Sequence, residues 1–224
     1  LDIGGNRGIY AYCLWRLGTK VEVFEPNPKC YSVLNAWAVN QPDVNIHLVA
    51  LSSRMGEANL HIPIDESGEE HDASASIELA EFSNSRDELV ALKALDSYQF
   101  SEVDLIKIDV EGHEYKVIEG AEATIFNSKP ALLIEIEQRH IERPIDEVFE
   151  KILGFGYQGF FLEDESLLPL EEFDLAMHQS IESFGTKKRY INNFLFLHRS
   201  KLIKGNYNSL MHAVCCSNIL EDEN

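Results

Sequence analysis

LDIGGNRG, at residues 1–8, decides the fold class of this chain together with VEVFE at residues 21–25. The first segment is typical of a strand end that runs into a glycine-rich turn, and the second is typical of a short buried strand. The pattern between them predicts a helix over residues 6–17. Its expected buried face has the spacing i, i+4, i+8: Ile9, Cys13 and Leu17. Strand, turn, helix and strand make a βαβ unit, which is the repeating unit of a parallel sheet.

The same alternation continues along the rest of the chain. Asn27 is expected to cap a second helix, and further helices are expected at residues 114–126 and 145–153. The expected buried face of the second helix comprises Cys30, Val33, Leu34 and Trp37. Five more strands are expected at residues 46–51, 104–110, 131–137, 158–162 and 194–198. Together these patterns predict a single α/β domain over residues 1–224, with helices on both faces of a mostly parallel sheet.

Four other segments are expected to lie outside this repeating pattern. Residues 58–64 are expected to form an added hairpin arm, and residues 89–95 an edge strand. The polar, poorly periodic residues 65–86 are expected to form a mobile surface loop that can close over a site. The acidic tail, residues 218–224, is expected to fray. Because the chain opens with Leu1 inside a strand, we expect the native N-terminus to extend further.

The composition excludes several classes of protein. The chain has 224 residues, of which 45% are hydrophobic and 25% charged, as in a globular domain. Its 19 basic and 38 acidic residues give a formal charge of 19 − 38 = −19, which repels nucleic acids and anionic membranes. No apolar run approaches the roughly 18 residues that span a bilayer. The four cysteines have no C-x-x-C spacing, so we expect a soluble, cytoplasmic protein with reduced thiols.

The glycine-rich turn is the first candidate site. In open α/β sheets, nucleotide-like ligands bind where the first strand turns into the first helix. Glu25 follows Gly8 by 17 residues and ends the second strand, where a carboxylate can accept protons from both ribose hydroxyls. The sequence therefore predicts a ribose-bearing ligand rather than a merely structural turn. The residues expected at the turn are Asp2, Gly4, Gly5, Asn6 and Gly8.

Charge favours one such ligand over another. A dinucleotide would place a diphosphate at the turn, where Asp2 repels it and Asn6 takes the space that a glycine would leave. S-adenosylmethionine has no phosphate, and its sulfonium and ammonium groups are attracted by an acidic loop. We therefore expect S-adenosylmethionine rather than NAD.

A second candidate site lies in DLIKIDVEGHEYKVIEGA, residues 104–121. Strand alternation puts Lys107, Asp109 and Glu111 on one face of a strand that is expected to be buried. Burying these groups is costly unless they are paired, so we expect Lys107 to pair with Glu135 on the neighbouring strand. A satisfied internal ion network is the structural alternative. The position of the cluster near the carboxyl ends of adjacent strands favours an active site.

His113 follows this strand directly, and its role is open between a general base and an ordinary residue at the start of a helix. The sequence lacks a compact metal-ligand motif, and we expect no metal, with a divalent ion held by Asp109, Glu111, His113 or Glu135 as the alternative. Residues 187–189 form the only basic cluster. They are expected to be a solvated turn, with contact to an acidic substrate group as the alternative.

These blocks together resemble a known family. LDIGGNRG, VEVFEPNP, KIDVEGHEYKVIEGA and KPALLIEIE are similar to segments of the FkbM family of S-adenosylmethionine-dependent methyltransferases, over residues 1 to about 162. The resemblance implies a Rossmann-like class I methyltransferase fold, with a seven-stranded sheet and an antiparallel last strand. It also implies O-methylation of a hydroxyl on a sugar or a secondary metabolite, which is a small-molecule substrate.

The resemblance implies a role for each part of the turn. The methionine part of the cofactor would contact Asp2, Gly4, Asn6 and Gly8, and the ribose would contact Glu25. The adenine would lie between Pro26 and the segment Ala50, Leu51 and Ser52. Asp109 would lie near the transferred methyl group.

The expected reaction is an in-line displacement, in which alignment of the reacting atoms supplies most of the acceleration. We expect His113 or Asp109 to remove the hydroxyl proton, with Lys107 and Glu111 setting the charge and orientation of that base. Two alternatives stay open from the sequence. One is an NAD-dependent oxidoreductase, and the other is a non-catalytic domain that binds S-adenosylmethionine.

Overall fold

The computed structural model describes residues 1–78, 84–180 and 190–215. Within these residues, eight strands form the main sheet. They are β1 (Asp2–Ile3), β2 (Val21–Phe24), β3 (Val44–His47), β7 (Leu105–Ile108), β8 (Ala131–Glu135), β9 (Tyr157–Glu163), β10 (Ser166–Pro169) and β11 (Asn193–His198). Their order in the sheet is β10-β9-β11-β8-β7-β1-β2-β3. The first strand along the chain, β1, therefore lies inside the sheet, between β2 and β7.

The pairing confirms a mostly parallel sheet with an antiparallel last strand. β1 is parallel to β2 and to β7, and β2–β3 and β7–β8 are also parallel. The last strand, β11, is antiparallel to both of its neighbours, β8 and β9. The expected seven strands are joined by β10, an eighth strand that forms a hairpin with β9. Both residues of the turn in this hairpin, Asp164 and Glu165, have left-handed backbones, as tight hairpins require.

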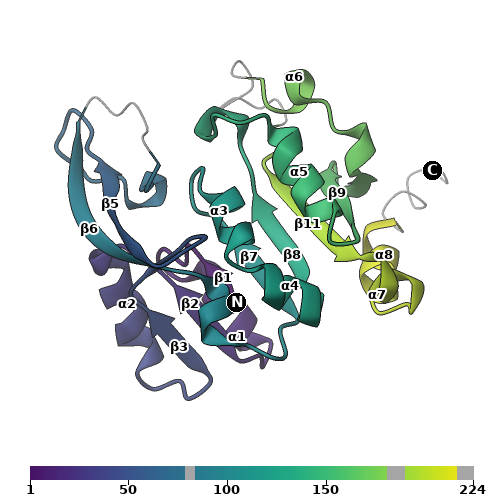
Figure 1. Cartoon of the computed structure of the whole chain (residues 1–224), viewed down its shortest axis with the longest axis horizontal. Coiled ribbons are helices and arrows are strands. Elements are labelled where there is room, and N and C mark those ends of the chain that lie inside the picture. Colours follow the sequence, from purple (N-terminus) through teal and green to yellow (C-terminus); the bar gives the residue numbers. More distant parts are fainter. Residues whose placement is uncertain (79–83, 181–189, 216–224) are drawn as a thin grey trace, which may run out of the picture.

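Helices cover both faces of the main sheet. On one face α1 (Ile9–Arg16) and α2 (Pro28–Ala38) pack on β2 and β3. On the other face the main core joins the strands to α3 (Glu114–Glu119), α4 (Glu122–Ser128) and α5 (Ile145–Leu153). The two faces separate because successive strand side chains alternate: Val23 belongs to the first core and Phe24 to the second. Figure 1 shows α3, α4 and α5 over the central strands.

The predicted buried face of α1 is wrong. Ile9 is 76% exposed, Leu17 is 78% exposed and Cys13 is also exposed, whereas Ala11 is completely buried. The helix has apolar residues on more than one side, so spacing alone does not identify the side that packs. Small Ala11 lets the backbone of α1 approach β2. For α2 the expectation holds at Cys30 and Leu34, whereas Val33 is 53% exposed.

The helix that was expected over residues 114–126 is two helices, α3 and α4. A Cβ at Gly120, between them, would lie 2.0 Å from the carbonyl oxygen of Ser52. The chain therefore passes too close to a neighbouring backbone at this point for a side chain to fit. The break brings Ser52 next to the end of α3.

A second, three-stranded sheet has the order β4-β6-β5. It consists of β4 (Ala50–Leu51), β5 (Gly56–Pro63) and β6 (Ser85–Lys93). The strand expected at residues 46–51 is therefore divided between the two sheets. β6 was expected to be an edge strand, but it is the central one because the two-residue β4 pairs with its end. In Figure 1 the long β5–β6 hairpin lies at the left of the molecule, above α2.

Part of the segment between β5 and β6 has defined secondary structure. Residues 64–78, here named the strap, contain a short 3-10 helix, η1 (Asp72–Ser74). The strap is tied to β5 by the bridge between His61 and Ser76, and Ile64 bridges Glu70 within it. The structure therefore gives residues 64–78 a defined path across the carboxyl ends of β1 and β2.

The remaining short elements lie mostly toward the end of the chain. They are η2 (Leu95–Tyr98), η3 (Gln138–His140), η4 (Leu170–Glu172), α6 (Leu175–His178), α7 (Arg199–Ile203) and α8 (Asn208–Cys215). The basic cluster at residues 187–189 and the tail at residues 218–224 lie outside the described residues. No helix among the described residues is long and apolar enough to cross a bilayer.

Candidate functional site

The glycine-rich turn folds against the ends of two strands. Gly4 has a left-handed backbone, with φ of 76°, and a Cβ at this position would lie 1.8 Å from the carbonyl oxygen of Asp109. Only glycine allows this approach of the turn to the end of β7. Asn6 also has a positive φ, of 45°, which directs its N–H toward β2. The turn thus brings the ends of β1, β2 and β7 together.

Glu25 directly follows β2 and is 6% exposed. Its two carboxylate oxygens accept hydrogen bonds from the backbone N–H groups of Asn6 and Asn27, each at 2.7 Å. Burial raises the pKa of Glu25 to about 7, although these two hydrogen bonds lower it. The carboxylate is therefore fixed in position and has lone pairs left for further donors.

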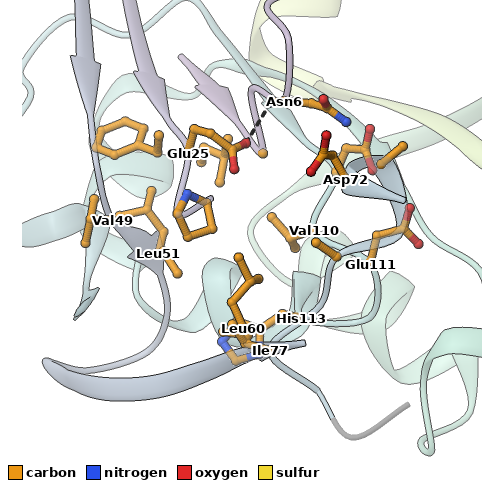
Figure 2. Close-up of a pocket in the computed structure, with 18 residues that line it drawn as sticks. Asn6, Glu25, Val49, Leu51, Leu60, Asp72, Ile77, Val110, Glu111 and His113 are labelled. Carbon is orange, nitrogen blue, oxygen red and sulfur yellow. Dashed lines mark hydrogen bonds between the residues drawn. The ribbon is translucent and has the colours of Figure 1, made fainter. Parts of the chain in front are cut away.

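A pocket opens beside Glu25. We name it the Glu25 pocket; it measures about 610 Å³ when its open mouth is included. Asn6, Glu25 and Asp72 line one part of the pocket, and much of the remaining lining is apolar, with Glu111 and His113 as further polar residues (Figure 2). The apolar lining consists of Ile3, Phe24, Pro26, Val49, Ala50, Leu51, Leu60, Ala73, Ala75, Ile77 and Val110. A pocket with an apolar wall and one fixed carboxylate suits a flat ring that carries a hydroxylated group.

Most residues that were predicted to bind a cofactor line the Glu25 pocket. These are Gly4, Asn6, Glu25, Pro26, Ala50, Leu51 and Asp109. Gly5 lines an adjoining cavity instead. Asp2, Gly8 and Ser52 are not part of the lining: Asp2 is completely buried, a Cβ at Gly8 would contact Leu34, and Ser52 binds His113. These three residues therefore lie next to the pocket residues and do not face the pocket itself.

The strap supplies pocket residues that sequence reasoning missed. Asp72, Ala73, Ala75 and Ile77 all line the Glu25 pocket. The one available signal was the expectation that residues 65–86 can close over a site. Nothing in the local sequence pattern indicated which of these residues would face the pocket.

Lys107 does not pair with Glu135, contrary to the expectation. Its Nζ lies 3.1 Å from Asp109 Oδ2 and 3.7 Å from Asp2 Oδ1, and it also donates to the carbonyl oxygen of Gly4 at 3.2 Å. Lys107 therefore balances two carboxylates at the turn and holds Asp109 at the pocket. Glu135 accepts a hydrogen bond from Asn192 at 2.6 Å instead.

A narrow space of about 160 Å³, counted with its open side and too tight to admit a water molecule, lies beyond Asp109. We name it the acidic cavity; it is lined by Asp109, Glu111, Gly112, Glu114, Glu135, Glu137 and His140. Asp109 and Glu111 also line the Glu25 pocket, so these two residues stand between the two spaces. Glu111 has a left-handed backbone, with φ of 50°, which is rare for residues other than glycine and is found often at functional sites.

Three carboxyl groups of the acidic cavity have raised pKa values. Burial, together with the charges of Asp109 and Glu137, raises the pKa of Glu111 to about 8. Burial raises the pKa of Glu114 to about 7. The pKa of Glu135 is also raised, by burial and by repulsion from nearby carboxylates. This part of the site therefore exchanges protons near physiological pH.

Glu137 differs from these neighbours. Burial raises the pKa of its carboxyl, but hydrogen bonds from Arg139, Tyr190 and Asn192 outweigh burial and hold the pKa below its usual range. Glu137 is therefore ionised at neutral pH. Its charge helps to keep the neighbouring carboxyls protonated.

His113 is held by two side chains. Its Nδ1 lies 2.5 Å from Glu78 Oε1 and its Nε2 lies 2.9 Å from Ser52 Oγ. Both ring nitrogens are therefore engaged, and the ring links Glu78 of the strap to Ser52, which directly follows β4. This arrangement favours a role in fixing the pocket wall over a role in proton transfer.

Among the described residues, no group of three or more histidine, cysteine or acidic residues could hold a metal ion.

Comparisons with known proteins agree with this architecture. The family profile described as the methyltransferase FkbM domain matches residues 2–159. Over 121 residues, the chain is 33% identical to the hexuronic acid methyltransferase AglP of Haloferax volcanii; the match covers 53% of this chain and 48% of that protein. The chain thus spans about half the length of this curated relative.

A solved structure has a similar fold. The crystal structure at 2.20 Å resolution of methyltransferase FkbM from Methylobacillus flagellatus KT aligns with a TM-score of 0.55 and 15% identity. The alignment covers 88% of this chain and 42% of that one. At this identity the likeness concerns the fold alone, whereas the family profile extends over most of the sequence, including the glycine-rich turn, Glu25 and residues 104–121. The chain belongs to the FkbM family of methyltransferases.

Proposed function

We propose that this protein is an S-adenosylmethionine-dependent methyltransferase that methylates a hydroxyl group of a sugar. The observation that carries the proposal is the environment of Glu25. Two backbone N–H groups fix this carboxylate at 2.7 Å each, and it faces a pocket whose remaining lining is largely apolar. A ribose diol and an adenine ring are the two chemical groups that match these two features.

The residues around the pocket fit an adenosyl cofactor. Glu25 would accept the ribose hydroxyls, and the apolar side chains of Val49, Leu51 and Val110 would contact the adenine. The turn and Asp109 supply negative charge where the methionine part would lie. When bound, the cofactor supplies an activated methyl group on a sulfonium, whose positive charge suits this acidic edge.

Asp109 is the residue that we propose as general base. It lines the Glu25 pocket, the adjoining cavity and the acidic cavity, so it is within reach of both a cofactor and an acceptor. Lys107 holds its carboxylate at 3.1 Å and would orient it toward the acceptor hydroxyl. Glu111, with a pKa of about 8, would be protonated at neutral pH and would hydrogen-bond the acceptor.

A sugar acceptor is supported by the relative of known substrate class. The Haloferax volcanii protein is a hexuronic acid methyltransferase, and Asp109 and Glu111 border the Glu25 pocket, where their carboxyl oxygens can accept hydrogen bonds from hydroxyl groups. A hydroxylated small molecule is a more suitable acceptor than a nucleic acid, because the chain carries a formal charge of −19.

Calorimetric titration with S-adenosylmethionine, S-adenosylhomocysteine and NADH tests the cofactor. We expect micromolar dissociation constants for the first two, corresponding to about −8 kcal/mol, and no binding of NADH. Methyl transfer from labelled S-adenosylmethionine to glucuronic acid glycosides then tests the acceptor, with deoxy analogues as controls. Binding of NADH without binding of either adenosyl compound would contradict the proposal.

A further inference from the structure

The Asp72 carboxylate, in the strap, is bound by three side chains that could also bind another anion. Arg7 Nη2 lies 3.0 Å from its Oδ2, Lys29 Nζ lies 2.9 Å from the same oxygen, and Asn27 Nδ2 donates to Oδ1 at 3.1 Å. The Asp72 side chain is only 3% exposed. Burial raises the pKa of Asp72, but the hydrogen bonds from Lys29, Arg7 and Asn27 outweigh burial and keep the pKa below its usual value.

The three partners of Asp72 come from two segments that each follow a strand of the main sheet. Arg7 belongs to the glycine-rich turn, whereas Asn27 and Lys29 belong to the start of α2, directly after Glu25. They meet at the rim of the Glu25 pocket, and Asp72 lines both this pocket and the adjoining cavity. Figure 2 shows Asp72 on the same side of the pocket as Asn6, and Val49 and Leu51 on the other.

Two cations and an amide around one carboxylate are also the groups that bind phosphate. In α/β sheets that bind dinucleotides, phosphates bind at the first turn, and an arginine near the end of the second strand accommodates a ribose phosphate. Arg7 and Lys29 would give this pocket the same capacity. Asp72 opposes this capacity, because it places a negative charge between the two cations and occupies the position where they converge. The side chains of Arg7 and Lys29 are otherwise 65% and 50% exposed, and Glu70 lies 3.5 Å from Lys29 Nζ.

We propose that Asp72 determines which ligands the pocket accepts: its carboxylate fills the anion site of Arg7, Lys29 and Asn27 and thereby excludes phosphorylated nucleotides. An incoming phosphate would have to displace Asp72 and would be repelled by it. A phosphate-free nucleoside would meet no such barrier. The identity of that nucleoside as the adenosyl cofactor rests on the proposed function, whereas the existence of the anion site does not.

Binding of inorganic phosphate, ADP and adenosine to Asp72→Asn, measured by calorimetry, tests the proposal. Asparagine keeps the size of the side chain and removes its charge. We expect this variant to bind inorganic phosphate at least tenfold more tightly than the unmodified protein. We also expect the ratio of the dissociation constants of ADP and adenosine to fall at least tenfold. Asp72→Ser, which is smaller, should show the same gains, and circular dichroism checks that both variants are folded.

Two further variants identify the cause. Glu66→Gln removes an exposed charge from the same strap and should behave like the unmodified protein. Adding Arg7→Gln to Asp72→Asn should reverse most of the gained phosphate affinity. Folded Asp72 variants that bind phosphate and ADP no better than the unmodified protein would overturn the proposal.

The same titrations separate this proposal from the proposed function. If Asp72→Asn gains phosphate affinity while neither adenosine nor S-adenosylmethionine binds, the anion site stands and the proposed cofactor is wrong. If adenosine and S-adenosylmethionine bind but the variants gain no phosphate affinity, the cofactor stands and the role of Asp72 is wrong.

Discussion

Glu25 is the residue on which the proposed cofactor depends most directly. Replacing Glu25 with glutamine removes a charged acceptor of the ribose hydroxyls, worth about 1.5 to 3 kcal/mol, so S-adenosylhomocysteine should bind roughly 10- to 100-fold more weakly. Titration calorimetry measures this change. Glu22→Gln is the matched control, because Glu22 lies on β2, which Glu25 directly follows, but pairs with His47 away from the pocket. Equal affinity in Glu25→Gln would mean that this carboxylate does not contact the ligand.

The protonation of Glu25 gives the binding a pH dependence. Hydroxyl donors bind the ionised carboxylate best, and burial raises the pKa of Glu25 to about 7. Protons therefore compete with the ligand below pH 7, and the affinity for S-adenosylhomocysteine should fall as the pH drops from 8 to 6. Glu25→Gln should flatten this profile. An affinity that rises toward acidic pH would contradict the assigned contact.

Asp109 is the residue that we propose as the general base of the methyl transfer step. Asp109→Asn should lower kcat by about 10²- to 10⁴-fold, the usual contribution of a general base, and should change cofactor affinity only a few-fold. Single-turnover assays with labelled cofactor measure the step. Asp104→Asn, an exposed position before β7, is the control. If His113→Asn instead loses turnover while remaining folded and Asp109→Asn does not, the base is His113.

The charged residues of β7 illustrate what the sequence could predict at this scale. Strand alternation predicted that Lys107 would be buried and paired, and it is 5% exposed and ion-paired. The predicted partner, Glu135, was wrong, because strand alternation does not show which neighbouring carboxylate a long lysine side chain reaches. The path of the turn beneath Lys107 decides in favour of Asp2 and Asp109. His113 was ambiguous for a similar reason, since its partners Ser52 and Glu78 come from distant segments.

At the scale of elements, the turn between β1 and α1 is joined to β7 by the contact at Gly4. Gly4→Ala puts a methyl group 1.8 Å from the carbonyl oxygen of Asp109 and should lower the free energy of unfolding by roughly 3 kcal/mol or more. Gly18→Ala is the matched control: its φ is also positive, at 78°, but no atom lies within 4 Å, so about 1 kcal/mol is expected. Urea unfolding measures both. Equal losses would mean that the close approach has no energetic weight.

The elements differ in how well local patterns predicted them. β2, β7 and β8 are short apolar runs, and each was expected at its observed position because a strand buried on both faces needs such a run. α1 was expected at its observed position but with the wrong face, since apolar residues occur all round it. β4 was missed as a separate strand because two residues carry no periodicity. Its pairing with β6 depends on contacts across about 40 residues of chain.

At the scale of the whole molecule, we propose that the described residues fold as one domain. The main core contains residues from β1, β7, α5 and β11, and no separate core is needed for the later strands. The small sheet has its own cluster around Ile62 and Val90, but its strap is held to the main sheet through Asp72. The path of the strap follows from these long-range ion pairs, which the sequence pattern did not contain.

The raised carboxyl pKa values give the whole molecule a distinctive pH dependence of stability. The groups concerned are Asp2, Glu25, Glu111, Glu114 and Glu135. In the unfolded chain such carboxyls lose their protons near pH 4.5, whereas Glu25 and Glu114 keep theirs to about pH 7 when folded, and Glu111 to about pH 8. Their favourable contribution is complete below pH 4.5 and is lost as the pH rises through 7 to 8.

Thermal unfolding between pH 5 and pH 8 tests this pH dependence. Glu114 alone, which is 2% exposed, should account for roughly 2 to 3 kcal/mol over this range, and Tm should therefore fall as the pH rises. His140 and His198 have lowered pKa values, because burial disfavours their charged forms. These two histidines favour a rise of Tm with pH, but they are fewer than the carboxyl groups with raised pKa values. Glu114→Gln should reduce the slope of Tm against pH, whereas the exposed Glu66→Gln should leave it unchanged. A Tm that stays level or rises from pH 5 to pH 8 would show that the acidic cavity is ionised in the folded protein.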